Sequence, residues 1–158
     1  MELKEITQGI YSLNGSAMPI DRRLVVAVHP YFALADSNQK YYEERKKFFK
    51  HYKGSVLIFN EEKFFQENVE SLIKESKGNI ENKFLVKTEF QDPQPINTTW
   101  ENIFKFSNYF SQPFHFIGGA ATKFQESKDY FSQGCLGKCF GKFTDAGFDA
   151  RVLSDITF

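Results

Sequence analysis

Glycine follows three amphipathic helical stretches, and each of these glycines leads into an apolar run. The junctions are Tyr52-Lys53-Gly54-Ser55-Val56, Ser76-Lys77-Gly78-Asn79-Ile80 and Asp145-Ala146-Gly147-Phe148. Because glycine readily adopts the left-handed conformation that closes a helix, each junction predicts a helix that ends and feeds a strand. Strands that alternate with helices form parallel sheets. The sequence therefore predicts an α/β fold, a three-layer doubly wound sheet of about five mainly parallel strands with helices on both faces.

Five apolar segments are the candidate strands of this sheet. They are expected at residues 24–28, 56–59, 84–90, 114–117 and 150–155. Asn60 is expected to cap the second helix, and Thr98 to Glu101 has the pattern of a capping box for the third. Residues 1–22 are predicted to form an N-terminal arm or edge hairpin, and residues 23–158 a single α/β domain. Within that domain, residues 120–132 are expected to form a short extra helix or a lid.

Composition excludes several classes of protein. The chain has 158 residues, the size of one domain, and its formal net charge is zero, so no overall field favours nucleic acid. No apolar segment approaches the roughly 20 residues that span a bilayer, and the N-terminus lacks the pattern of a signal peptide. Two cysteines cannot form a disulfide framework. We expect a cytoplasmic protein that needs no cofactor or metal, contacts neither nucleic acid nor membrane, and binds a small molecule.

Polar residues are expected to gather at one edge of the sheet. In open parallel sheets, ligands bind beyond the carboxyl ends of the strands, where the strand order reverses. His115 begins a strand and so belongs to the opposite edge, which argues against a metal site shared with His29. The residues at the productive edge are His29, Tyr31, Asn60, Lys87, Glu89, Asp92, Gly118, Gly119 and Asp155.

Lys87 lies within a strand that is expected to be covered on both faces. A lysine in such a place is costly to desolvate unless it is paired or has a lowered pKa. Glu89 is two residues further on and points to the same face, so a structural Lys87–Glu89 contact is one interpretation. If this strand lies at the sheet edge, Lys87 reaches water instead. A functional lysine is the third alternative.

Two cysteines and a pair of glycines are the other candidates. Cys135 is expected in the first turn of the last helix, where the helix dipole would stabilise a thiolate, while Cys139 is one turn deeper. Both also share a face with apolar side chains, which favours a core position. Gly118-Gly119 follows a strand, as phosphate-binding turns do, but it lacks their glycine spacing. A tight turn is the alternative.

Three features of the sequence together resemble the isochorismatase-like cysteine hydrolases. They are the lysine of the third strand, the glycine turn, and the cysteine-led helix that runs into Gly147-Phe148-Asp149-Ala150-Arg151-Val152-Leu153-Ser154-Asp155. That resemblance implies a doubly wound parallel sheet and a Cys–Asp–Lys triad that hydrolyses amides or vinyl ethers through a covalent intermediate. It makes Cys135 the nucleophile and Lys87 the family lysine. His29 stands where the family has its aspartate, and its ordinary pKa near 6.5 suits a base.

Three hypotheses about function follow. The first is a diverged isochorismatase-like cysteine hydrolase that acts on a small amide or related metabolite, or that has lost activity, with Cys135, Lys87 and His29 as its catalytic residues. The second is a non-catalytic small-ligand or nucleotide-binding module of Rossmann-like architecture. The third is a homo-oligomeric interaction module, with a homodimer as the expected assembly. The ligand-binding candidates are Tyr31, Glu89, Gly118 and Gly119.

Overall fold

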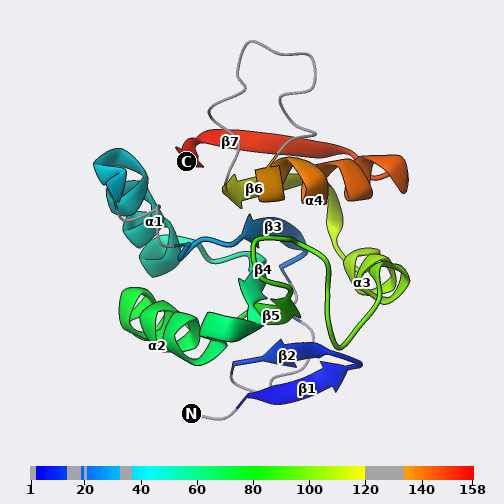
Figure 1. Cartoon of the computed structure of the whole chain (residues 1–158), viewed down its shortest axis with the longest axis horizontal. Helices are drawn as coiled ribbons and strands as arrows, with labels where there is room; N and C mark the ends of the chain where they lie inside the picture. Colours follow the sequence, from blue (N-terminus) through cyan, green and yellow to red (C-terminus); the bar gives the residue numbers. More distant parts are fainter. Residues whose placement is uncertain (1–2, 14–18, 20, 33–36, 120–133) are drawn as a thin grey trace.

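The protein is described by a computed structural model that covers residues 3–13, 19, 21–32, 37–119 and 134–158 (Figure 1). The predicted α/β class is confirmed, but the sheet has seven strands rather than about five. The strands are β1 (Lys4–Thr7), β2 (Ile10–Ser12), β3 (Arg23–Val28), β4 (Ser55–Glu61), β5 (Lys83–Thr88), β6 (Ser111–Gly118) and β7 (Ala150–Thr157). The α-helices of the described residues are α1 (Gln39–His51), α2 (Phe65–Ser76), α3 (Trp100–Ser107) and α4 (Gly134–Asp145).

The two additional strands come from the N-terminal residues. The strand order is β1-β2-β5-β4-β3-β6-β7. In the hairpin, β1 pairs antiparallel with β2, and β2 pairs antiparallel with β5. The other five strands, in the spatial order β5, β4, β3, β6 and β7, are all parallel to one another. Along the chain, the parallel strands first run from β3 through β4 to β5 and then restart on the other side of β3 at β6. The strand order therefore reverses between β3 and β6.

Side chains of the central strand alternate between two apolar clusters. Leu24, Val26 and Val28 of β3 pack in the cluster that contains residues of α3 and α4. Val25 and Ala27 pack in the cluster that contains residues of α1 and α2. Because successive side chains of a strand point to opposite faces, each helix pair covers its own face of the sheet. In Figure 1, α1 and α2 accordingly lie together, apart from α3 and α4.

Asn60 belongs to a strand rather than to a helix cap, so that prediction is wrong. The ladder between β4 and β5 continues to the end of both strands, pairing Asn60 with Lys87 and Glu61 with Thr88. This pairing holds Asn60 in extended backbone. A short 3₁₀ turn at 62–64 then precedes α2. Asn60 is almost fully buried, and among the described residues neither polar atom of its amide has a hydrogen-bond partner.

Helix ends follow the sequence signals in most places. Asn38 caps α1 by accepting a hydrogen bond from the Tyr41 N–H, and Thr99, one residue later than the start of the expected capping box, caps α3. Gly78 and Gly147 have the positive φ angles expected of helix ends, whereas Gly54 does not. The longest described helix, α1, has 13 residues, and no helix of the described chain could cross a bilayer. Residues 120–132, expected as a helix or lid, lie outside the described residues.

Candidate functional site

His29 is the residue that most clearly marks the carboxyl edge of the sheet. It follows β3 directly, with φ of 44°, and its N–H donates to the Phe59 carbonyl at 2.9 Å. Only 3% of the residue is exposed. Its Nε2 lies 2.7 Å from the Thr88 hydroxyl oxygen at the end of β5. The imidazole therefore reaches across the end of β4 and joins two strand ends.

The Thr88 hydroxyl determines which nitrogen of His29 carries the proton. That hydroxyl has one proton, and it donates to the Glu89 carbonyl at 3.1 Å. With its proton on that carbonyl, the hydroxyl oxygen accepts from Nε2–H of His29 and Nδ1 is an unprotonated acceptor; in the other tautomer the hydroxyl donates to Nε2 and Nδ1 carries the proton. Nδ1 is buried and has no hydrogen-bond partner in the part of the chain that the structure describes. A buried polar atom left unpaired costs about 1–3 kcal/mol, so a ligand or water that donates to Nδ1 would remove a real penalty.

Burial keeps the His29 imidazole neutral. Desolvation lowers its pKa to about 4, and the negative charge of Asp92 only partly opposes this effect. At neutral pH the side chain is consequently an uncharged hydrogen-bonding group held in one orientation. It is a poor proton acceptor at that pH, because a base works best when its pKa lies near the operating pH.

Cys135 lies in the first turn of α4 and is half-buried. Burial raises the pKa of its thiol to about 11, the carboxylates of Asp92 and Glu61 also raise it, and only Lys138 lowers it. The expected thiolate is thus not favoured, because desolvation outweighs any stabilisation from the helix terminus. Cys139 is fully buried in the core, and burial raises its pKa well above the ordinary value.

Asp92 links the His29 side of this edge to the Cys135 side through its charge. It acts electrostatically on both His29 and Cys135, and its carboxylate lies 3.9 Å from the Lys138 ammonium. An open hollow of about 380 Å³ lies beside it, between the loop after β5 and α4. Residues that line this hollow include Asp92, Gln94, Trp100, Gly137, Lys138 and Lys142. His29, Thr88 and Cys135 are not among the residues that line this hollow. We call the hollow together with these three residues the strand-end site.

Lys87 does not belong to the strand-end site. Leu85 lies in the cluster of α1 and α2 and Val86 in the cluster of α3 and α4, so alternation places Lys87 on the α2 face. There its ammonium lies 5.0 Å from the centre of the Phe65 ring, whereas Cys135 packs on the α4 face. The structure therefore does not bring Lys87 to Cys135.

The structure shows neither of the two structural roles expected for Lys87, which were a contact with Glu89 and a position on an edge strand. β5 pairs with β2 and β4 and is not an edge strand. Glu89 lies beyond the end of β5, is exposed, and makes no ion pair with Lys87 among the described residues. Lys87 instead lies over the rings of Tyr11 and Phe65 as a cation–π contact.

Tyr31 and Asp155 also lie away from the strand-end site. The Tyr31 hydroxyl donates to Glu75 on α2 at 3.2 Å, and its ring stacks on Phe49. Asp155 is exposed on β7 and lies 3.2 Å from the Lys40 ammonium. These two residues therefore contact α1 and α2 rather than α4.

Gly118 and Gly119 allow close packing of the chain on itself. Gly118 has φ of 103°, and a Cβ there would lie 2.1 Å from the Val28 carbonyl oxygen. A Cβ on Gly119 would lie 2.6 Å from the Phe158 ring. The space beside both glycines is thus filled by the protein itself, which favours the tight-turn interpretation over a phosphate cradle.

Several residues in and around the site were not predicted from the sequence, among them Thr88, Glu61, Gln94, Trp100, Lys138 and Lys142. Thr88 and Glu61 occupy final strand positions where they read as ordinary strand residues, and Lys138 reads as an exposed helix residue. The alternation of β4 and β5 could have placed Glu61 and Thr88 on the α4 face. Within the described chain, no three histidine, cysteine or acidic side chains are placed to hold a metal ion.

Comparison with known proteins found no match to a family model, a curated protein or a solved structure.

Proposed function

We propose that this protein binds a small polar molecule at the strand-end site without transforming it. The observation that carries the proposal is the buried Nδ1 of His29, which has no hydrogen-bond partner among the described residues and which the hydrogen bond to Thr88 holds in place. Such an atom is costly in the empty protein and is satisfied by a ligand N–H or O–H. The neighbouring hollow is of a volume that small ligands occupy.

The chemistry of the site favours a neutral ligand of the amide type. Nδ1 accepts one hydrogen bond, while Lys138 supplies a donor and Asp92 an acceptor at the rim. A primary amide offers both N–H donors and a carbonyl acceptor, and so it matches this set. The half-buried Trp100, held by its own hydrogen bond to Gln94, adds an apolar surface.

We further infer that the fold is a three-layer doubly wound one. The reversal of strand order between β3 and β6 and the helix pairs on the two faces support this inference. The ligand site then lies at the edge where such folds bind their ligands. The free state of Cys135 and Cys139 suits a reducing, cytoplasmic setting. The homodimer stays a prediction.

Nuclear magnetic resonance titration with benzamide tests the binding proposal. We expect the resonances of His29, Asp92 and Lys138 to move together, with saturable binding and a raised melting temperature. The Lys138→Gln variant, which changes an exposed side chain, should bind more weakly. Lys105→Gln on α3 is the matched control, because Lys105 is exposed and lies outside the site. Resonance shifts scattered over the surface, or none at millimolar benzamide, would exclude the proposal.

A diverged isochorismatase-like cysteine hydrolase is the second candidate. The observation that favours it is the electrostatic contact of Asp92 with both His29 and Cys135, which indicates an acid, an imidazole and a thiol at one edge. In such an enzyme, the Cys135 sulfur would attack the amide carbon, the amine would leave with a proton, and water would release the acid.

Turnover separates the two candidates. The hydrolase requires ammonia release from a primary amide and its loss in Cys135→Ser. The binding protein requires amide binding with no ammonia release, and binding that survives Cys135→Ser. Detection of an acyl-enzyme on Cys135 by mass spectrometry would replace the first proposal by the second.

A further inference from the structure

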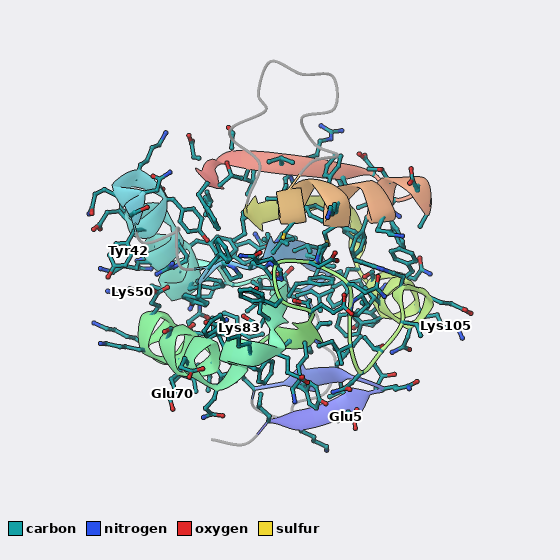
Figure 2. The ribbon with its side chains drawn as sticks, viewed as in Figure 1. Glu5, Tyr42, Lys50, Glu70, Lys83 and Lys105 are labelled. Carbon is teal, nitrogen blue, oxygen red and sulfur yellow. The ribbon has the colours of Figure 1, made fainter. Side chains whose placement is uncertain are left out.

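A cationic groove lies between α1 and α2, on the opposite face of the sheet from Cys135. It has a volume of about 680 Å³, larger than the hollow of the strand-end site. Figure 2 shows Tyr42 and Lys50, two of its lining residues, on the α1 flank of the molecule. Its cationic lining residues are Arg45, Lys46, Lys47, Lys50, Lys74 and Lys77.

The groove concentrates positive charge on a chain that is neutral as a whole. Two carboxylates, Glu43 and Glu75, line it against six cationic side chains, and Glu44, outside the lining, lies 3.7 Å from the Lys47 ammonium, which leaves an excess of three charges. The chain has 20 basic and 20 acidic residues in total. The excess is therefore a local feature of this surface.

Most of the lysines lack an acidic partner. Among the described residues, no carboxylate lies within 4.0 Å of the ammonium groups of Lys46, Lys50, Lys74 or Lys77. Lys46 and Lys50 are four residues apart on α1, a spacing at which like charges destabilise a helix. Bringing these groups around one concave surface is thus unfavourable in the absence of an anion.

The floor of the groove is rigid. Arg45 is 2% exposed, and its guanidinium donates to both carboxylate oxygens of Glu75, at 3.1 Å and 2.6 Å. It also donates to the Pro30 carbonyl at 3.0 Å and lies over the Tyr31 ring. This ion pair joins α1 to α2 and so holds the lysine-bearing ends of the two helices in position relative to each other.

Helix dipoles explain only part of the excess charge. The lysines lie toward the C-terminal ends of α1 and α2, and each such end carries about half a negative elementary charge. Two helix ends therefore offset about one of the three excess charges. The positive charge that remains would be neutralised by a multivalent anion.

We propose that this groove binds a small molecule that carries two or more linked phosphate groups. Linked phosphates supply several negative charges at spacings that lysines from two helices contact together. The site is concave, as small-ligand sites are, rather than an extended basic face of the kind that contacts nucleic acid. It shares none of its lining residues with the hollow of the strand-end site, and so it stands whether or not that site binds an amide.

Calorimetric titration of the full chain with inorganic tripolyphosphate tests the proposal. We expect one molecule bound per chain, with an affinity that falls as salt rises. The double variant Lys46→Gln/Lys50→Gln should weaken binding by about tenfold or more, because each lost charge removes a direct attraction. Orthophosphate at equal ionic strength should bind far more weakly. A nucleoside triphosphate that binds more tightly than tripolyphosphate would identify a nucleotide as the source of the phosphates.

The matched control is Lys4→Gln/Lys105→Gln, which makes the same change in net charge. Lys4 and Lys105 are exposed and lie on β1 and α3, outside the groove, and Figure 2 shows Lys105 at the far side of the molecule from Lys50. Equal weakening in the two double variants would overturn the proposal, because binding would then depend on net charge alone. Tighter binding of a single-stranded oligonucleotide than of tripolyphosphate would overturn it as well.

Discussion

Lys87 and Cys135 lie on opposite faces of the sheet. The Lys87 ammonium lies over the Phe65 ring at the start of α2, while Cys135 packs with the core cluster that contains α4. A lysine and a thiol placed in this way cannot share one reacting carbon. This separation, with the raised pKa of the Cys135 thiol, is why we favour a binding site over a cysteine hydrolase.

The acid sensitivity of the protein should depend on His29. Its pKa is about 4 in the folded protein and near 6.5 when unfolded, so between these values only the unfolded chain gains the proton. The free energy of unfolding should therefore fall as the pH drops from about 6.5 to 4, by up to about 3 kcal/mol. Denaturant unfolding across this range measures it.

His29→Gln should remove this part of the pH dependence. The same substitution at His51, which is exposed in the last turn of α1, is the matched control. Equal flattening of the pH profile in both variants would show that the buried imidazole is not its source.

Lys83 should destabilise the folded protein at neutral pH. It is fully buried at the start of β5, its ammonium donates to the Asn79 carbonyl, and burial lowers its pKa to about 8. Between pH 8 and 10.5 the unfolded chain binds more protons, so stability should rise with pH. Lys83→Met should add about 1–3 kcal/mol at pH 7, less what the lost hydrogen bond contributes.

Thermal unfolding of Lys83→Met at pH 7 and pH 10 checks this prediction. The gain over the natural chain should be smaller at pH 10, where the folded lysine is neutral. A variant that is less stable at both pH values would show that the hydrogen bond to Asn79 outweighs the cost of burying the charge.

Gly118→Ala should be strongly destabilising, whereas Gly141→Ala should be neutral or stabilising. Gly118 combines a positive φ with a close approach to Val28, so a methyl group must displace backbone. Gly141 lies inside α4 with nothing near its added Cβ, and alanine favours a helix by about 1 kcal/mol over glycine. Denaturant unfolding of both variants compares them directly. Similar stabilities would contradict the tight-turn interpretation of Gly118.

The sequence predicted the parallel part of the sheet well. Each of the five expected strands overlaps one of β3 to β7, because continuous β-branched and aromatic runs bounded by turn residues mark buried strands clearly. For residues 1–22 it left an N-terminal arm and an edge hairpin open, and the structure has the edge hairpin. The sequence alone did not decide between them, since pairing between distant segments leaves no local signal. Asn60 was assigned to a helix cap because asparagine favours caps, but the pairing with Lys87 extended the strand.

The sequence predicted that His29 lies at the carboxyl edge of the sheet, but not which residues surround it there. The position of His29 after β3 followed from the strand-end rule. Its partner Thr88 did not, because the positive φ of His29 turns the imidazole across β4, and a backbone angle of that kind cannot be read from the residue type. The face that Lys87 occupies follows from alternation along β5, but which helices cover that face is known only once the packing of Leu85 is seen in the assembled sheet.

The rate at which Cys135 reacts with iodoacetamide, measured as a function of pH, tests the central claim most directly. Mass spectrometry locates the modified residue, and the fully buried Cys139 serves as the internal reference. The account predicts slow alkylation at pH 7 and a rate that rises toward a pKa of about 11. Rapid alkylation at pH 7 with a midpoint below the ordinary thiol pKa of about 8.5 would contradict it and restore the cysteine nucleophile.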